Sequence, residues 1–158
     1  MSAPSSPSDH HRMSPPAISV RTAAIPLLVL LGIELVLGIS LNLFVNLPMG
    51  ATVTAVLSSQ PILDLHILDA ALLVGVSTLA VVLSRSEPTR RPALAAALAL
   101  VSALGASAGG WEFVFNGQDP ASAGVMVLGF LGVLVGAILL RAWGSRTVAG
   151  ATPSTAVA

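Results

Sequence analysis

Four long apolar runs dominate the pattern of hydrophobic and polar positions along the chain. They cover residues 22–45, 62–83, 92–115 and 121–140. Each has about 20 residues or more, enough for a helix to cross a hydrocarbon core of about 30 Å. Open loops and unpaired strands cannot lie there, because lipid offers backbone groups no hydrogen-bond partner. The pattern predicts an all-α fold, an integral membrane four-helix bundle.

The two ends of the chain, residues 1–21 and 143–158, are rich in Ser, Pro and small side chains. Such segments bury too little apolar surface to offset the entropy of ordering, so we expect two disordered tails. Three short connections join the apolar runs: residues 46–61, 84–91 and 116–120. They leave no room for a separate soluble domain, and the predicted transmembrane domain covers residues 22–142.

The positions of the positive charges predict how the chain is threaded. There is no Lys, and all seven Arg fall on one face of a four-span protein: Arg12, Arg21, Arg85, Arg90, Arg91, Arg141 and Arg146. Positive residues in short loops favour the cytoplasmic side. We therefore expect a multi-pass protein of the bacterial plasma membrane with both termini in the cytoplasm. The connections at 46–61 and 116–120 then face outward.

The composition agrees with a membrane environment and excludes several kinds of chemistry. Apolar residues make up 54% of the chain and charged residues only 9%, against about a quarter charged in soluble domains. The net charge is zero and the sequence has no basic patch large enough to neutralise many phosphates, so we expect no nucleic-acid partner. The absence of Cys excludes disulfides and iron–sulfur clusters within the chain. The expected partners are the lipid bilayer and either another membrane protein or a second copy of this chain.

Ionisable side chains nevertheless interrupt the apolar runs on the outward side. At 1.5 Å per residue, His66 lies about 6 Å and Asp69 about 10 Å from the outer end of the second run, and Glu34 about 16 Å from the outer end of the first. A charged carboxylate that faces lipid costs at least a few kcal/mol. We therefore expect these groups to line an outward-facing polar pocket between helices. The predicted pocket contains Glu34, Asn42, Asn46, His66, Asp69, Glu112 and Asn116.

Small residues recur at four-residue spacing in the last two runs. Gly105 and Gly109 form one such pair, and Gly132 and Gly136 form another. This spacing permits close helix contact in lipid, where packing drives association. The pairs predict packing within the bundle, or alternatively the contact surface of a homodimer.

His66 raises the alternative of a redox cofactor. A neutral His on a transmembrane helix is an ordinary axial ligand of haem b, and Met126, at a similar depth in the fourth run, is a candidate second ligand. A quinone is a related alternative at the same site. A metal bound by His66, Asp69 and Glu112 is less favoured, because no His-x-x-x-His or Glu-x-x-His pair accompanies them.

Two other functions follow from the polar residues. Four residues, Glu34, Asn42, Asp69 and His66, are arranged like one half of a proton or solute pathway, but the inward halves of the runs lack a matching set. Nucleophilic catalysis is disfavoured, because Ser58 and Ser59 lack the Gly-x-Ser-x-Gly turn. We therefore expect an accessory or small-ligand-binding membrane protein rather than an enzyme.

A spaced set of residues runs through the first three apolar runs: Glu34, Gly38, Asn42, Asn46 and Pro48, then His66, then Gly109, Gly110, Phe113 and Asn116. On this pattern, residues 22–142 resemble a set of small bacterial four-span membrane proteins without assigned activity. The resemblance implies the fold and the membrane location and no activity. The His in the second run is also similar to that of four-helix b-type cytochromes, but the further His residues of those proteins are missing here.

Overall fold

The computed structural model describes residues 19–45, 60–115 and 119–144, and within these ranges the chain is helical without any strand. The four helices are α1 (Val20–Phe44), α3 (Pro61–Ser84), α4 (Arg90–Phe115) and α5 (Pro120–Trp143). The predicted all-α bundle is therefore confirmed. The largest difference from the predicted runs is at the end of α5, which continues from residue 140 to Trp143. The predicted tails lie largely outside the described residues.

Local sequence signals explain where the helices begin. The Ser19 side chain accepts a hydrogen bond from the backbone N–H of Thr22 at 3.2 Å and thereby caps α1. Asp119 caps α5 in the same way, accepting from the N–H of Ser122 at 3.1 Å. Both caps satisfy N–H groups that a helix leaves without partners in its first turn. α3 and α5 also start with a proline, whose missing N–H costs little at that position.

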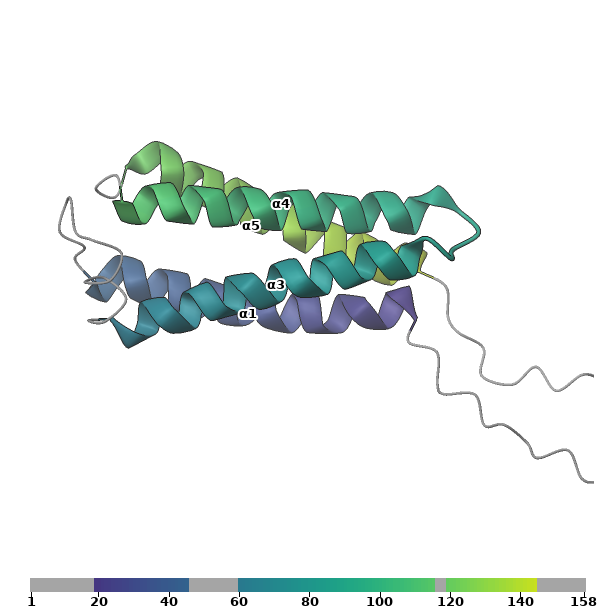
Figure 1. The fold of residues 1–158 in the computed structure, drawn as a ribbon, viewed down its shortest axis with the longest axis horizontal. Helices are drawn as coiled ribbons and strands as arrows, with labels where there is room; N and C mark the ends of the chain where they lie inside the picture. Colours follow the sequence, from purple (N-terminus) through teal and green to yellow (C-terminus); the bar gives the residue numbers. More distant parts are fainter. Residues whose placement is uncertain (1–18, 46–59, 116–118, 145–158) are drawn as a thin grey trace, which may run out of the picture.

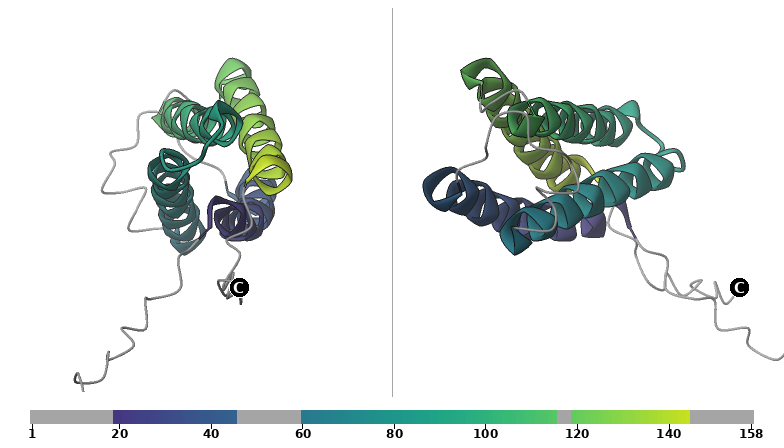
Figure 2. Two further views of the ribbon diagram at one scale, coloured as in Figure 1. Left: turned by 90° about the vertical axis from the view of Figure 1, so that its right-hand side faces the viewer. Right: turned by 60° about the vertical axis from the view of Figure 1, so that its left-hand side comes forward.

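The helices form an antiparallel up-and-down bundle in which each packs against two others (Figure 1). The contacting pairs are α1 with α3, α3 with α4, α4 with α5, and α5 with α1. At one end of the bundle, Gly144 lets the end of α5 approach the start of α1 closely, since a Cβ added there would lie 2.8 Å from the backbone N of Arg21. Figure 2 shows this arrangement along the bundle. The start of α1, the end of α5 and the connection from α3 to α4 all lie at that same end (Figure 1).

The distribution of side chains is the reverse of that in a water-soluble bundle. The interior consists largely of small residues, and Ala96, Ala99 and Ala137 are completely buried. Large aliphatic side chains instead point outward, with Leu94 67% and Leu128 71% exposed. Contiguous apolar surface of this kind is stable only against another apolar phase. All four helices are long and apolar enough to span a membrane, which is consistent with a multi-pass membrane protein.

Glycines bring α4 and α5 closer together than any other pair of helices. A Cβ added at Gly136 would lie 2.8 Å from the Cβ of Ala99, and one added at Gly132 would overlap the hydroxyl of Ser102. These two glycines therefore serve packing between helices of one chain, one of the two predicted roles. Gly105 differs, because no atom lies within 4 Å of the position of its missing Cβ.

Candidate functional site

One buried and two partly buried ionisable residues of the described bundle meet between α1 and α3. Glu34 lies on α1 about 15 Å from its end at Phe44. His66 and Asp69 lie in the second and third turns of α3, three residues apart and hence on one helix face. The antiparallel packing of α1 against α3 brings the three side chains together. We call Glu34, His66 and Asp69 the acid–imidazole cluster.

His66 is held against α1. Its Nδ1 lies 3.2 Å from Oε2 of Glu34, within ion-pair distance, and the two side chains are 19% and 18% exposed. The pair lacks the geometry of a hydrogen bond, and both atoms are themselves buried. Gly38 lies one turn from Glu34, and a Cβ added there would be in ordinary contact with Cε1 of the imidazole, at 3.7 Å. The imidazole ring thus packs onto the α1 backbone next to the carboxyl group.

Asp69 is the most buried acid in the described part of the chain, with only 5% of the residue exposed. Its carboxyl group interacts with that of Glu34 at hydrogen-bonding range. A hydrogen bond between two carboxyl groups requires a proton on one of them. The Oδ2 atom of Asp69 is buried and has no hydrogen-bond partner among the described residues. Together with Oε2 of Glu34, it is a buried acceptor of the acid–imidazole cluster that accepts no hydrogen bond from the described residues.

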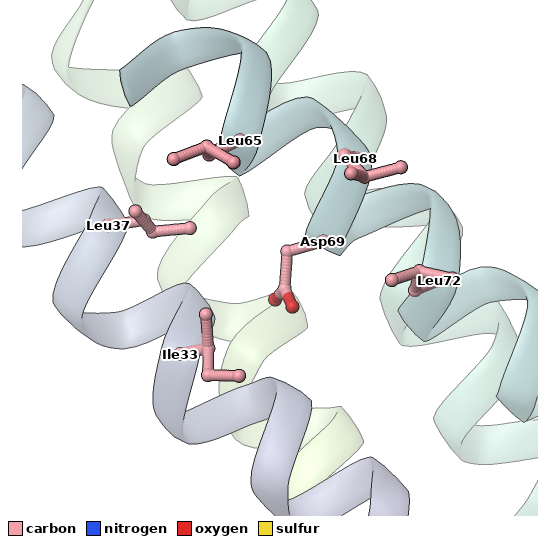
Figure 3. Close-up of a pocket in the computed structure, with 6 residues that line it drawn as sticks. All are labelled: Ile33, Leu37, Leu65, Leu68, Asp69 and Leu72. Carbon is pink, nitrogen blue, oxygen red and sulfur yellow. The ribbon is translucent and has the colours of Figure 1, made fainter. Parts of the chain in front are cut away.

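A groove of about 190 Å³ lies between α1 and α3, and Asp69 is one of the residues that line it. In Figure 3 the Asp69 carboxylate points into the space between the two helices, and the other labelled side chains surround it. We call this the α1–α3 groove, and its walls are Ile33, Leu37, Leu65, Leu68 and Leu72. Ile33, Leu65, Leu68 and Leu72 are also 45% to 57% exposed on the outer surface of the bundle. The groove therefore opens sideways, toward the apolar phase around the protein.

The remaining predicted pocket residues lie elsewhere or outside the described residues. Asn42 is exposed near the end of α1, and Glu112 is exposed near the end of α4. Asn46 and Asn116 lie outside the described residues. The structure thus brings together three of the seven predicted residues, from the two helices that carry the deepest acids. The sideways opening of the groove is a feature that the sequence did not predict.

The residues considered as cofactor ligands contact different helices. His66 faces Glu34 and Gly38 of α1. Met126 lies on α5, and a Cβ added at Gly110 of α4 would lie 3.5 Å from its Sδ. In the described part of the chain, no group of three or more His, Asp or Glu is arranged to hold a metal ion.

The apolar walls of the α1–α3 groove could not be recognised from the sequence. Leu65, Leu68 and Leu72 follow the spacing of any lipid-facing stripe, and only the packing of α1 beside them makes a groove. Ser77 shows the same limit, since its hydroxyl is fully buried without a partner among the described residues. No protein-family model matches the chain, and neither a curated protein nor a solved structure is similar to it at a significant level.

Proposed function

We propose that this chain is a multi-pass protein of the bacterial plasma membrane that binds a small lipophilic ligand from the side. The ligand lies in the α1–α3 groove and places a hydrogen-bond donor or a positive charge against Asp69. The observation that carries this proposal is that Asp69, whose buried Oδ2 has no partner among the described residues, lines an otherwise apolar groove. Leaving a buried acceptor without a partner costs about 1–3 kcal/mol. A ligand that supplies the donor recovers that energy.

Ionisable side chains between membrane-spanning helices are stronger evidence of a functional site than the same side chains in a soluble protein. An ionisable residue within a transmembrane segment is expensive and usually marks a binding site or an ion path. Here two acids from different helices meet an imidazole, although the surrounding bundle consists mainly of Ala, Leu, Val and Gly. Packing alone would be served equally well by apolar residues. This supports a functional role for the cluster.

The groove favours binding over conduction of protons or solutes. A pathway would have to continue from Asp69 toward the Arg-rich end of the bundle. The next buried polar group on α3 is Ser77, about 12 Å further along the helix. Leu73 lies between them and is itself buried in the apolar core. The polar groups of the described residues on α3 are thus interrupted below the acid–imidazole cluster.

We also assign both termini to the cytoplasm. Five described arginines lie at one end of the bundle, where the described chain begins and ends: Arg21, Arg85, Arg90, Arg91 and Arg141. Positive residues near short loops are retained on the cytoplasmic side during insertion. The acid–imidazole cluster then lies in the outer half of the membrane, nearer the ends of α1 and α3 that carry no Arg.

Photolabelling tests the proposed site. The protein is placed in lipid nanodiscs with a short aliphatic alcohol that carries a diazirine, a neutral probe with a hydroxyl donor. We expect labelling to concentrate on the α1 and α3 residues that wall the groove. Leu68→Trp fills the groove and reduces this labelling severalfold, whereas Leu128→Trp, at an exposed position on α5, leaves it unchanged. Equal labelling of all exposed helix faces, or no effect of Leu68→Trp, would refute the proposal.

A further inference from the structure

The acid–imidazole cluster contains more acids than bases. It has two carboxyl groups, from Glu34 and Asp69, and one imidazole, from His66. Even with a protonated imidazole, two ionised carboxylates leave a net charge of −1. An uncompensated charge at this depth is strongly unfavourable. The cluster therefore needs one additional positive charge, which is supplied either by a second proton or by a bound cation.

The polar atoms around the α1–α3 groove are matched to a positive ligand. Asp69 is the one residue with a polar side chain among those that line the groove, and its buried Oδ2, which as a carboxylate oxygen accepts hydrogen bonds, has no partner among the described residues. The imidazole Nδ1 of His66 lies against Glu34 instead. A ligand with carbonyl groups, such as a quinone, needs a donor from the protein, and Asp69 offers one only when it holds a proton. A cationic group is suited to the ionised form.

The walls of the groove define the rest of the ligand. Ile33, Leu37, Leu65, Leu68 and Leu72 are all aliphatic, so the body of the ligand must be apolar. A cavity of about 150 Å³ accommodates one benzene ring. The groove of about 190 Å³ therefore fits a single ring or a short branched chain with a compact charged head.

We infer that the α1–α3 groove takes a lipophilic monovalent organic cation, with the positive nitrogen at Asp69 and the apolar body among the leucines. The cation replaces the proton that otherwise neutralises the cluster, so one proton leaves when one cation binds. This inference rests on the proposed function, because it names the chemical class of the sideways ligand. Its charge requirement can be tested separately from the existence of the site.

The test compares two probes of the same shape. Benzyltrimethylammonium carries a positive nitrogen, and neopentylbenzene has a neutral carbon at the same position. Binding of the radiolabelled cation to the full chain in zwitterionic nanodiscs is measured by equilibrium dialysis, with the neutral probe as competitor. We expect saturable cation binding that a matched concentration of neopentylbenzene does not displace. Circular dichroism and size-exclusion chromatography confirm that each variant below remains folded.

Variants assign the effect to one carboxyl group. Asp69→Asn keeps the size of the side chain and removes its charge, and we expect the affinity for the cation to fall about tenfold or more, as on loss of one member of a buried charge pair. Asp64→Asn makes the same change at an exposed acid on the same helix and leaves the affinity unchanged. Leu68→Trp, which fills the groove without changing its charge, abolishes binding.

Each result separates this inference from the proposed function. Equal affinity for the two probes, or unchanged cation binding by Asp69→Asn, would overturn the charge requirement. The labelling of the groove by the neutral diazirine alcohol would then still stand. If neither probe binds and the alcohol does not label the groove, the sideways site itself is refuted. Loss of cation binding in Asp64→Asn to the same extent would show that surface charge, and not the cluster, attracts the probe.

Discussion

The acids of the described spans differ in how much of their charge can be screened. Asp64 and Glu112 are exposed near helix ends, whereas Asp69 is 5% exposed and the Glu34 side chain 18%. Glu34 contacts both other members of the acid–imidazole cluster, since it lies within ion-pair distance of His66 and interacts with the carboxyl group of Asp69. Glu34 is therefore the central residue of the acid–imidazole cluster.

The central position of Glu34 predicts how its variants behave. Glu34→Ala leaves the His66 and Asp69 side chains without this partner, and we expect the free energy of unfolding to fall by about 1–3 kcal/mol. Glu34→Gln supplies an amide that can both donate and accept, so its stability should remain within about 1 kcal/mol of the wild type. Unfolding by SDS in mixed micelles measures both values. Equal stability of Glu34→Ala and wild type would show that the contacts contribute nothing.

Competition between protons and cations predicts a pH dependence of ligand binding. The charged groups that act on Asp69 are Glu34 from α1 and His66 from α3, while α4, also packed on α3, carries Glu112 at an exposed position. Protonation of the cluster removes the negative charge that the cation needs. The affinity for benzyltrimethylammonium should therefore fall with falling pH, by up to about tenfold per pH unit for exchange of one proton.

Dialysis of the same nanodiscs at several pH values measures this change, with Asp64→Asn as the matched control. The control should show the same pH profile as the wild type, because it leaves the cluster intact. Labelling by the neutral alcohol should not follow the cation profile. A cation affinity that stays constant over the range in which the protein remains folded would contradict proton exchange.

The sequence predicts the members of the cluster better than its geometry. Glu34, His66 and Asp69 are recognisable because each interrupts an apolar run, and the cost of exposing them to lipid predicts a shared interior. Depths counted from the helix ends separate Glu34 from His66 by about 10 Å, yet their side chains are 3.2 Å apart. The two helices are inclined to each other (Figure 1), and both side chains are long. A depth calculated from the number of residues along each helix includes neither the inclination of the helices nor the reach of the side chains.

At the scale of the elements, the two halves of the bundle are packed differently. α4 and α5 contact each other along a series of small residues, whereas α1 and α3 are separated by the larger side chains of the groove. At Gly129 a Cβ would lie 2.6 Å from the Cβ of Ala106, and at Gly136 it would lie 2.9 Å from the carbonyl oxygen of Ala95. The α4–α5 pair thus forms a rigid support, and the ligand site lies in the more open half.

This difference predicts opposite effects of the same substitution within α5. Gly136→Ala forces α4 and α5 apart and should lower the free energy of unfolding by about 1–3 kcal/mol, as other overpacked cores do. Gly124→Ala meets no atom within 4 Å and should keep or raise it by up to about 1 kcal/mol, because Ala favours the helix. SDS unfolding compares the two variants. Similar changes at both positions would show that the contact is not close.

The sequence predicts where each helix begins and ends to within three residues, but not which helices pack against each other. Apolar length locates all four spans, because the physics of the bilayer allows few alternatives, and the prolines at residues 61, 92 and 120 mark the first turns of the last three. The spacing of Gly132 and Gly136 indicates a close contact without naming the partner helix. Gly105 and Gly109 have the same spacing, but only Gly109 packs tightly, with Val125 and Ser122 near its missing Cβ. Which face meets a neighbour depends on how each helix is rotated in the bundle.

At the scale of the whole molecule, charge and polarity are separated along the bundle axis. The five described arginines lie at one end, while the acid–imidazole cluster lies nearer the other end, about 15 Å from the end of α1 at Phe44. Trp111 and Trp143 are both exposed, near the ends of the successive antiparallel helices α4 and α5 and hence near opposite ends of the bundle. Indole rings at both ends suit the two interfaces of a bilayer. The threading proposed above therefore determines which side of the membrane exchanges protons with the cluster.

Cysteine labelling tests that threading, and the absence of native Cys makes single substitutions sufficient. Ser86→Cys lies in the connection between α3 and α4, at the Arg-rich end, and Gln60→Cys lies just before α3, at the opposite end. With both termini in the cytoplasm, a membrane-impermeant maleimide added to intact cells should label Gln60→Cys alone. After the membranes are disrupted, both variants should react, which shows that each thiol is accessible. The reverse pattern in intact cells would place the arginines outside, and the cluster would then face the cytoplasmic half of the membrane.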